Sequence, residues 1–427
     1  MSKVRIPQVP KKKLEQGLPK GHYPAGPYGG YPYPEPPSEP VALEPGACEI
    51  VILTSAKERS FNPPDDKSAK VKLTAELRPK RAVRDGETVL WSLIGGENDG
   101  TVKFSSPDTL TSEILARKPN KTRVRVQLFD AGGNEICKAE TDLSVPQFFF
   151  VFAVQPRDDP DEEEPEGATF LDALIDLGLQ ISLDPLNDTL EASMAKVELN
   201  TQIQDKVVSR AIEVAKNAFK GVNVRFVTKD PKDLVGKDNY SFVALSGLSP
   251  KRDRQGDAPT DVGNKNPKDL IRVFGGEFSD MRAVAGPDPN YGKIFIGFAR
   301  TFRIPGETMQ AGGNGLQMGQ LVTDPAKAQN RAQLIAYAAF EVVSRLIGHT
   351  IAHECGHSLG LVPGADEGHN PKPLGTIMDA GKVQSLKART GLSRFDVATK
   401  RAAFGSPAGF DKNNLQILQK VLPILSS

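Results

Sequence analysis

Residues His349–Asn370 read HTIAHECGHSLGLVPGADEGHN and contain four of the five histidines in a chain of 427 residues. The preceding residues, 330–348, read NRAQLIAYAAFEVVSRLIG and place apolar side chains on most faces of a helix. A helix that is apolar on most faces is typically buried in a protein core. The sequence therefore predicts one long buried helix over 330–360 that carries clustered histidines.

Within this helix, His353, Glu354 and His357 form an HExxH motif. At about 100° per residue, the two histidines are separated by about 40° of rotation and one turn of rise, so both rings face one point. Glu354 lies on the same side and can reach a water molecule beside a bound metal, as a general base must. A surface helix with unrelated His and Glu side chains is the alternative, and the apolar composition disfavours it.

The sequence after the motif extends this pattern. Gly360 completes HExxHxxG and allows the helix to end through a residue with positive φ. Residues 373–381, PLGTIMDAG, supply a tight turn with Met378, whose alternative role is ordinary core filling. Together these features resemble the metzincin zinc peptidases. The resemblance implies Zn²⁺ held by three protein ligands in a cleft between two subdomains.

The third ligand departs from the family pattern, because its usual position is occupied by Pro363, which has no donor atom. The next candidates are Asp366, Glu367 and His369. Neutral imidazole suits zinc, so His369 is the expected ligand and Asp366 remains the alternative. The expected metal ligands are His353, His357 and His369, with Glu354 as the catalytic base.

Two other residues of the helix invite a functional interpretation. His349 lies one turn before His353, and it either supports the site or is an ordinary hydrogen-bonded histidine of the helix body. Cys355 lies about 200° around the helix from His353, so we expect it to face the core and not to be a ligand or nucleophile.

Residues 45–145 contain short runs rich in β-branched residues and separated by turn signals, and apolar and polar residues alternate within 69–77 and 122–130. About seven strands, with Trp91 in one of them, resemble a bacterial immunoglobulin-like sandwich. Cys48 and Cys137 fall in the first and last strands, either as a disulfide or as two buried thiols. The runs are 48–56, 69–77, 87–95, 101–106, 122–130 and 134–145.

Residues 1–44 are rich in Pro, Gly and Tyr without an apolar period, which predicts a disordered tail. The tail is either a linker or a segment that docks a partner. A further run, RDDPDEEEPEG at 157–167, is predicted to be a solvated acidic loop.

Residues 146–427 are predicted to form the α+β zincin domain. We expect strands at 145–154, 222–228, 240–247 and 292–300, and helices at 197–219, 393–404 and 413–425. In metzincins an edge strand of the sheet binds extended substrate, and GKIFIGFAR at 292–300 is the candidate for that strand.

Composition excludes some classes of partner. Lys and Arg number 54 against 53 Asp and Glu, so no bulk charge favours nucleic acid or anionic membrane. No run of about 20 consecutive apolar residues predicts a membrane span, and MSKVRIPQVPKKKLEQGLPK has no apolar region typical of a Sec signal. The localisation stays open.

The sequence therefore predicts a multidomain protein: a tail (1–44), an all-β sandwich (45–145) and a metzincin-like catalytic domain (146–427). The expected function is a zinc-dependent endopeptidase that acts on a protein or peptide substrate. The alternatives are a non-catalytic adhesion or structural protein with a stabilising zinc, and a peptidase effector or cargo of an injection or phage-like apparatus.

Overall fold

The fold is an α+β arrangement of antiparallel sheets, one mixed sheet and helices. The predicted tail at 1–44 and the predicted acidic loop at 157–167 lie outside the residues that the structure describes. The computed structural model describes residues 48–54, 70–94, 102–116, 119–154, 169–170, 173–174, 190–247, 249, 254–278, 293–294, 323–362, 369–370, 375–380 and 384–424.

Among the described residues before 146, seven strands form two antiparallel sheets, with the orders β1-β2-β5-β4 and β3-β6-β7. Side chains from both sheets meet in one hydrophobic cluster. In β2 the alternation predicted from the sequence holds, since Val71, Leu73, Ala75 and Leu77 are all buried. Strand β5 had no predicted counterpart. The strands are β1 Glu49–Leu53, β2 Lys70–Arg78, β3 Thr88–Ile94, β4 Val102–Phe104, β5 Thr111–Ala116, β6 Asn120–Phe129 and β7 Glu135–Val145.

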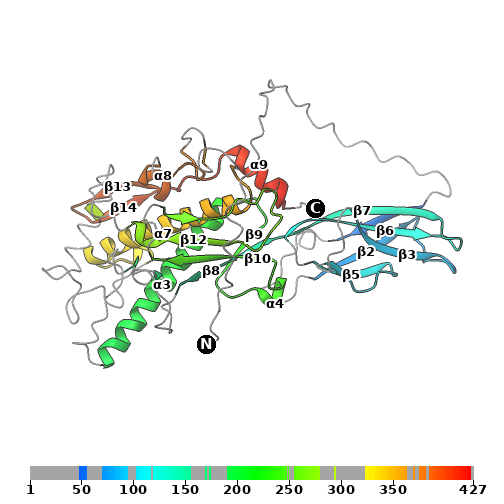
Figure 1. Ribbon diagram of the computed structural model, residues 1–427, viewed down its shortest axis with the longest axis horizontal. Helices are drawn as coiled ribbons and strands as arrows, with labels where there is room; N and C mark the ends of the chain where they lie inside the picture. Colours follow the sequence, from blue (N-terminus) through cyan, green and yellow to red (C-terminus); the bar gives the residue numbers. More distant parts are fainter. Residues whose placement is uncertain are drawn as a thin grey trace, which may run out of the picture. The chain divides into compact units, whose positions relative to one another are not determined.

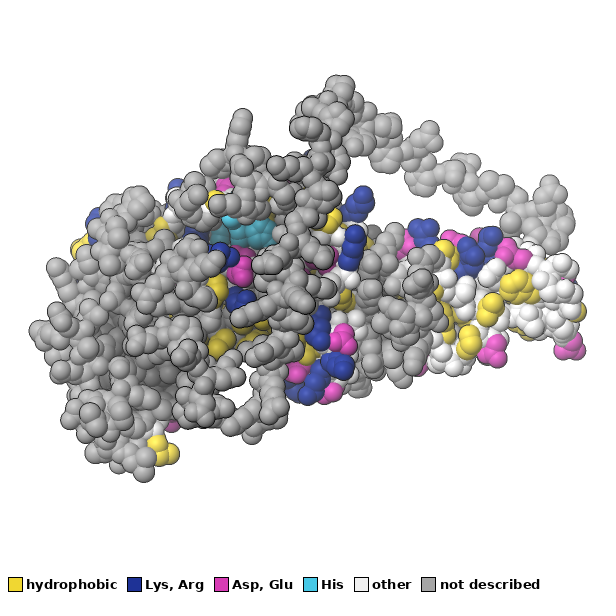
Figure 2. Space-filling model, in the orientation of Figure 1, with side chains coloured by type: hydrophobic (Ala, Val, Ile, Leu, Met, Phe, Trp, Pro, Cys, Tyr) yellow, Lys and Arg dark blue, Asp and Glu magenta, His cyan; other side chains and the backbone are white. Residues whose placement is uncertain are grey.

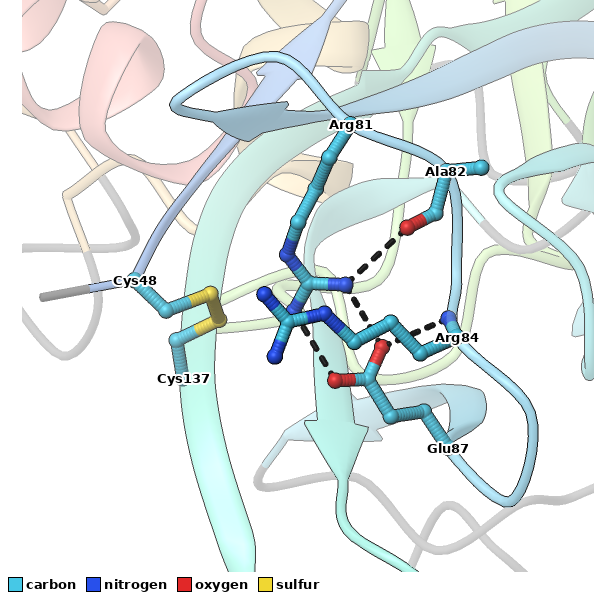
Figure 3. Close-up of a disulfide and its surroundings, with 6 residues drawn as sticks. All are labelled: Cys48, Arg81, Ala82, Arg84, Glu87 and Cys137. Carbon is cyan, nitrogen blue, oxygen red and sulfur yellow. Dashed lines mark hydrogen bonds and ion pairs between the residues drawn. A yellow bond between two sulfur atoms is a disulfide. The ribbon is translucent and has the colours of Figure 1, made fainter. Parts of the chain in front are cut away.

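The two sheets are linked covalently. Cys48 and Cys137 form a disulfide with a Cα–Cα distance of 5.7 Å, which decides between the two alternatives for these cysteines (Figure 3). Because β1 and β7 belong to different sheets, the bond joins one sheet to the other. Trp91 is buried, and its indole N–H donates to the carbonyl oxygen of Thr109 at 2.7 Å.

A further, five-stranded sheet has the order β11-β12-β10-β8-β9. Its inner strands run parallel, whereas the short edge strand β11 is antiparallel to β12. The predicted strands at 145–154, 222–228 and 240–247 are confirmed. The bounds are β8 Gln147–Ala153, β9 Val224–Val227, β10 Tyr240–Ser246, β11 Gly256–Asp257 and β12 Leu270–Phe274.

Alternate residues of this sheet enter two different cores. Phe149 and Val151 of β8 pack with the long helices α3 (Leu190–Ala218) and α7 (Arg331–Ser358), which lie side by side in Figure 1. Phe148 and Phe150 belong to a smaller cluster on the opposite face, beside α4 (Lys232–Val235). The sheet is therefore covered on one face by the helix that carries the HExxH motif.

Helix α7 is buried along almost its whole length, as the sequence predicted. At Gly348 it approaches α3 so closely that a Cβ there would lie 2.7 Å from the Cβ of Val214. By length and composition α7 is also apolar enough to cross a membrane. However, 89% of its most apolar segment is buried inside the protein, as in many core helices.

One expectation for the C-terminal half differs from the structure. Residues 393–404 were expected to be helical, but they form a hairpin of β13 (Leu392–Asp396) and β14 (Arg401–Phe404). The reason is turn chemistry, because Asp396 accepts hydrogen bonds from the backbone N–H groups of Ala398 and Thr399, and Lys400 has φ 61°. Helix α8 (Leu386–Thr390) precedes the hairpin, and α9 (Lys412–Val421) confirms the last predicted helix.

The expected edge strand at 292–300 lies outside the described residues except for Lys293 and Ile294, which are helical. Among the described strands, the sheet edge nearest α7 is instead β11, which contacts that helix. A strand of two residues carries too little pattern to be found in a sequence.

A buried ion cluster ties α7 to α3. Glu341 of α7 is 2% exposed and accepts hydrogen bonds from Arg210 of α3 at 2.8 Å and 3.0 Å and from Arg345 at 2.6 Å. Arg345 also donates to the carbonyl oxygens of Thr390 and Gly405. Glu341 therefore balances the positive charges of two guanidinium groups where α3, α7 and the segment from Thr390 to Gly405 meet.

Replacing Glu341 by Ala should lower the free energy of unfolding by about 3–5 kcal/mol, because it leaves the buried Arg345 guanidinium without its carboxylate partner. The matched control is Glu213→Ala, since Glu213 also pairs with Arg210 but is 61% exposed in its side chain. Removing an exposed pair should cost about 1 kcal/mol or less. Equal losses in the two variants, measured by denaturant unfolding, would contradict this account.

Candidate metal centre

Three histidines converge at the end of α7. His353 and His357 come from its last turns, and His369 comes from the segment that follows. One ring nitrogen from each lies within 4.8 Å of the others. The ring centroids are 4.7 Å to 5.7 Å apart. Figure 2 shows histidine side chains gathered in one cyan patch on the visible face.

Hydrogen bonds define how the two helix histidines are protonated. The Nδ1 atom of His353 lies 2.6 Å from the carbonyl oxygen of Ile377, and Nδ1 of His357 lies 3.4 Å from that of Leu361. A carbonyl oxygen can only accept, so each Nδ1 carries the proton. The two Nε2 atoms, 3.1 Å apart, therefore direct lone pairs at each other. A cation could lie between them.

A proton is a poor candidate for that cation. Burial, reinforced by the neighbouring His357, lowers the pKa of His353 to about 3. Burial likewise lowers the pKa of His357 to about 4, with the charge of His369 as the second cause. Both imidazoles are therefore neutral near pH 7, which is the state that binds a metal.

The distances fit a metal ion. Tetrahedral zinc with Zn–N bonds of about 2.0–2.1 Å separates neighbouring ligand nitrogens by about 3.3 Å. The observed separation of the His353 and His357 Nε2 atoms is 3.1 Å. His369 adds a buried Nδ1 atom that has no hydrogen-bond partner in the described part of the chain. The three residues could thus hold a metal ion through nitrogen ligands.

The turn at residues 375–380 lies directly beneath the two helix histidines. Met378 is completely buried, and its Sδ atom would lie 2.8 Å from a Cβ at Gly356. The carbonyl oxygen of Ile377, the residue before Met378, accepts the hydrogen bond from His353 Nδ1. The turn therefore supports the centre by packing and by fixing one ring.

Gly360 ends the helix as the sequence predicted, with φ 87°. Its N–H donates to the carbonyl oxygen of His357 at 2.8 Å. A Cβ at this position would lie 2.6 Å from the Cα atom of Val262, in the loop between β11 and β12. Glycine is required here both for the positive φ and for this close approach.

Glu354 lies against the edge strand β11. Its side chain is so close to Gly256 that a Cβ there would overlap the carboxyl group. Glu354 is 7% exposed, and burial together with the charge of Asp257 raises its pKa to about 8. The absence of a side chain at residue 256 is thus what makes room for the carboxyl group.

The remaining candidates are placed as follows. Cys355 is fully buried in the core, as predicted, and burial raises the pKa of its thiol. His349 is also buried, and its Nε2 atom has no hydrogen-bond partner among the described residues. Asp366 and Glu367, the other candidates for the third ligand, lie outside those residues.

Sequence reasoning missed several residues that shape the centre. Gly256 could not be singled out, because its importance comes from a contact with Glu354, 98 positions later in the printed sequence. Asn370, Asp379 and Gln384 surround the turn of Met378 with hydrogen bonds. The only sequence signal for them was that Asn370 and Asp379 adjoin residues already singled out.

Comparison with known proteins gives no assignment. No protein-family model matches the chain, and no curated protein matches it.

Replacing His369 by Ala should weaken zinc binding by at least about 10- to 100-fold, the loss typical of even indirect support for a metal ligand. Asp366→Ala, the matched variant for the alternative ligand, should change the affinity much less. Both affinities can be measured by competition with a chromophoric chelator. Loss of zinc from the Asp366 variant with retention in the His369 variant would assign the third ligand to the carboxylate.

Proposed function

We propose that the protein is a zinc-dependent endopeptidase whose catalytic domain has a metzincin-like zincin fold. The observation that carries the proposal is the pair of Nε2 atoms 3.1 Å apart on a buried helix, with Glu354 between them in sequence. A metal site of this kind with an adjacent carboxyl group is suited to hydrolysis.

Zinc is the proposed metal because the ligand set consists of imidazole nitrogens in a buried position. Imidazole also suits copper, iron and nickel, but a tetrahedral site with three protein ligands and one open position is typical of catalytic zinc. His353, His357 and His369 would hold the ion. The carbonyl oxygens of Ile377 and Leu361 would keep the rings of the first two in the required tautomer.

The proposed chemistry divides the work between the ion and the chain. When bound, zinc would polarise the scissile carbonyl and lower the pKa of a water molecule to about 7. The charge of the bound ion would favour the carboxylate form of Glu354. In that form Glu354 would accept the proton of the attacking water and then deliver it to the leaving amine. The close contact with Gly256 would hold the carboxyl group on the side of the helix that faces the sheet edge.

The fold features support the finer assignment. A sheet covered by two helices, an antiparallel edge strand beside the histidine helix and a methionine turn beneath it all agree with the metzincin pattern. The two antiparallel sheets before residue 146, with buried Trp91 and an inter-sheet disulfide, agree with an immunoglobulin-like sandwich. We propose both folds for these regions.

A structural zinc in a non-catalytic protein is the second candidate. A purely structural site closes its coordination with protein ligands and has no use for a neighbouring carboxyl group. The placement of Glu354 against the edge strand, with glycine opposite, favours the catalytic proposal.

Replacing Glu354 by Gln should leave zinc binding intact and reduce kcat by about 100- to 10,000-fold, because it removes the proton acceptor alone. Glu213→Gln, on the exposed side of α3, is the matched control and should retain full activity. Turnover can be measured on a peptide library with both variants loaded with zinc. A peptidase as active in the Glu354 variant as in the control would place the base elsewhere.

Replacing Gly256 by Ala should displace the Glu354 carboxyl group, and a shift of about 1 Å can cost about 100-fold in rate. Zinc affinity should stay the same, because no histidine is displaced. Gly409→Ala is a suitable control, since a Cβ there meets no atom within 4 Å. An unchanged kcat in the Gly256 variant would show that this contact does not position the base.

A further inference from the structure

We propose that Asp379 is a positioning residue that holds His369 at the metal through Asn370. The inference rests on the proposed zinc site, and it assigns to a residue outside the HExxH motif the placement of the third ligand. It is carried by a set of hydrogen bonds that links the turn of Met378 to the residue next to His369.

Asp379 is almost completely buried, and its two carboxylate oxygens have different partners. Oδ2 accepts the backbone N–H groups of Gly375 at 2.6 Å and Thr376 at 3.0 Å, which closes the turn. Oδ1 accepts the side-chain amide of Asn370 at 2.7 Å and the hydroxyl of Thr376 at 3.3 Å. One oxygen therefore shapes the turn and the other reaches outside it.

Asn370 makes two more hydrogen bonds to the turn. Its backbone N–H donates to the carbonyl oxygen of Met378 at 3.0 Å, and its side-chain amide donates to the Thr376 hydroxyl at 3.0 Å. Since Asn370 directly follows His369, these bonds fix the backbone that carries the third histidine. The His369 ring itself has a buried Nδ1 atom with no hydrogen-bond partner in the described residues, so that atom does not anchor it.

The same turn also holds the first ligand. The carbonyl oxygen of Ile377 accepts from His353 Nδ1, and the Gln384 amide donates to the carbonyl oxygens of Ile377 and Asp379. One turn thus connects two of the three histidines, although they are 16 positions apart in the sequence. Asp379 is the side chain whose hydrogen bonds keep the turn closed and attached to Asn370.

Asp379→Asn separates these two roles. With its amide oxygen in place of Oδ2, the new side chain still accepts the N–H groups of Gly375 and Thr376. Its NH₂ group then faces the NH₂ group of Asn370, and the two can pair only if the Asn370 amide turns over and gives up its donor bond to the Thr376 hydroxyl. The variant should weaken zinc binding by about 10- to 100-fold, the usual cost of losing support for a ligand.

Rescue by exchange tests the geometry directly. Adding Asn370→Asp to the Asp379→Asn variant places a carboxylate opposite the amide and restores a donor-to-acceptor pair. The double variant should recover at least half of the lost affinity on a logarithmic scale. Asp396→Asn is the matched control, because Asp396 also accepts two backbone N–H groups, in the turn between β13 and β14.

The experiment measures zinc affinity by chelator competition, the visible absorption spectrum of the Co²⁺ form and the unfolding midpoint of the metal-free protein. We expect weaker zinc binding and an altered Co²⁺ spectrum in Asp379→Asn, recovery in the double variant and no change in Asp396→Asn. Wild-type affinity in Asp379→Asn, or a double variant that binds no more tightly than the single one, overturns the proposal.

Asn370→Ala covers the case in which Asp379→Asn does not fold, because it removes the side-chain link and leaves the turn unchanged. It should also lose about 10-fold or more in zinc affinity, and wild-type affinity would overturn the proposal. The outcomes separate this inference from the proposed function. A wild-type protein that binds zinc but cleaves no peptide contradicts only the function, whereas one that binds no zinc contradicts both.

Discussion

The candidate metal centre depends on the lone pairs of two imidazole rings that face each other beside the buried helix α7. His353 and His357 each direct Nδ1 to a backbone carbonyl oxygen, so their Nε2 atoms approach to 3.1 Å with no hydrogen between them. Two neutral acceptors at that distance repel each other, and burial disfavours protonation of either ring. A metal ion would remove this conflict, and His353, His357 and His369 could hold one.

Holding the rings in place requires a rigid helix, and four contacts along α7 support it. Gly348 brings α7 against α3, and the Glu341 cluster joins both helices to the segment around β13 and β14. Gly356 makes room for Met378 beneath the histidines, and Gly360 makes room for the loop after β11. At each of these glycines another segment packs so close to α7 or its C-terminal end that a Cβ atom would overlap it.

The sequence predicted the elements whose pattern is local. The apolar helix, the HExxH spacing and the alternation of β2 each occupy one continuous stretch, so periodicity was sufficient to find them. His369 was also expected beside the other two histidines, from its ligand chemistry and its place after Gly360. The disulfide between Cys48 and Cys137 stayed open, because spacing alone cannot show that two strands are neighbours.

The features that the sequence did not predict are those made by contacts between distant residues. The sequence predicts a helix where β13 and β14 form a hairpin, because its helix-forming residues outnumber the one turn-forming residue, Asp396. Strand β11 has only two residues, and its role comes from the space that Gly256 leaves for Glu354. The bonds from Asp379 to Asn370 likewise exist only after the chain has folded back.

The most direct test of the central claim is X-ray absorption spectroscopy at the zinc edge of the stoichiometrically loaded protein. The account predicts a first shell of nitrogen and oxygen atoms at about 2.0–2.1 Å, with the multiple-scattering signature of three imidazoles. A sulfur scatterer at about 2.3 Å, or a shell with fewer than two imidazoles, would contradict it.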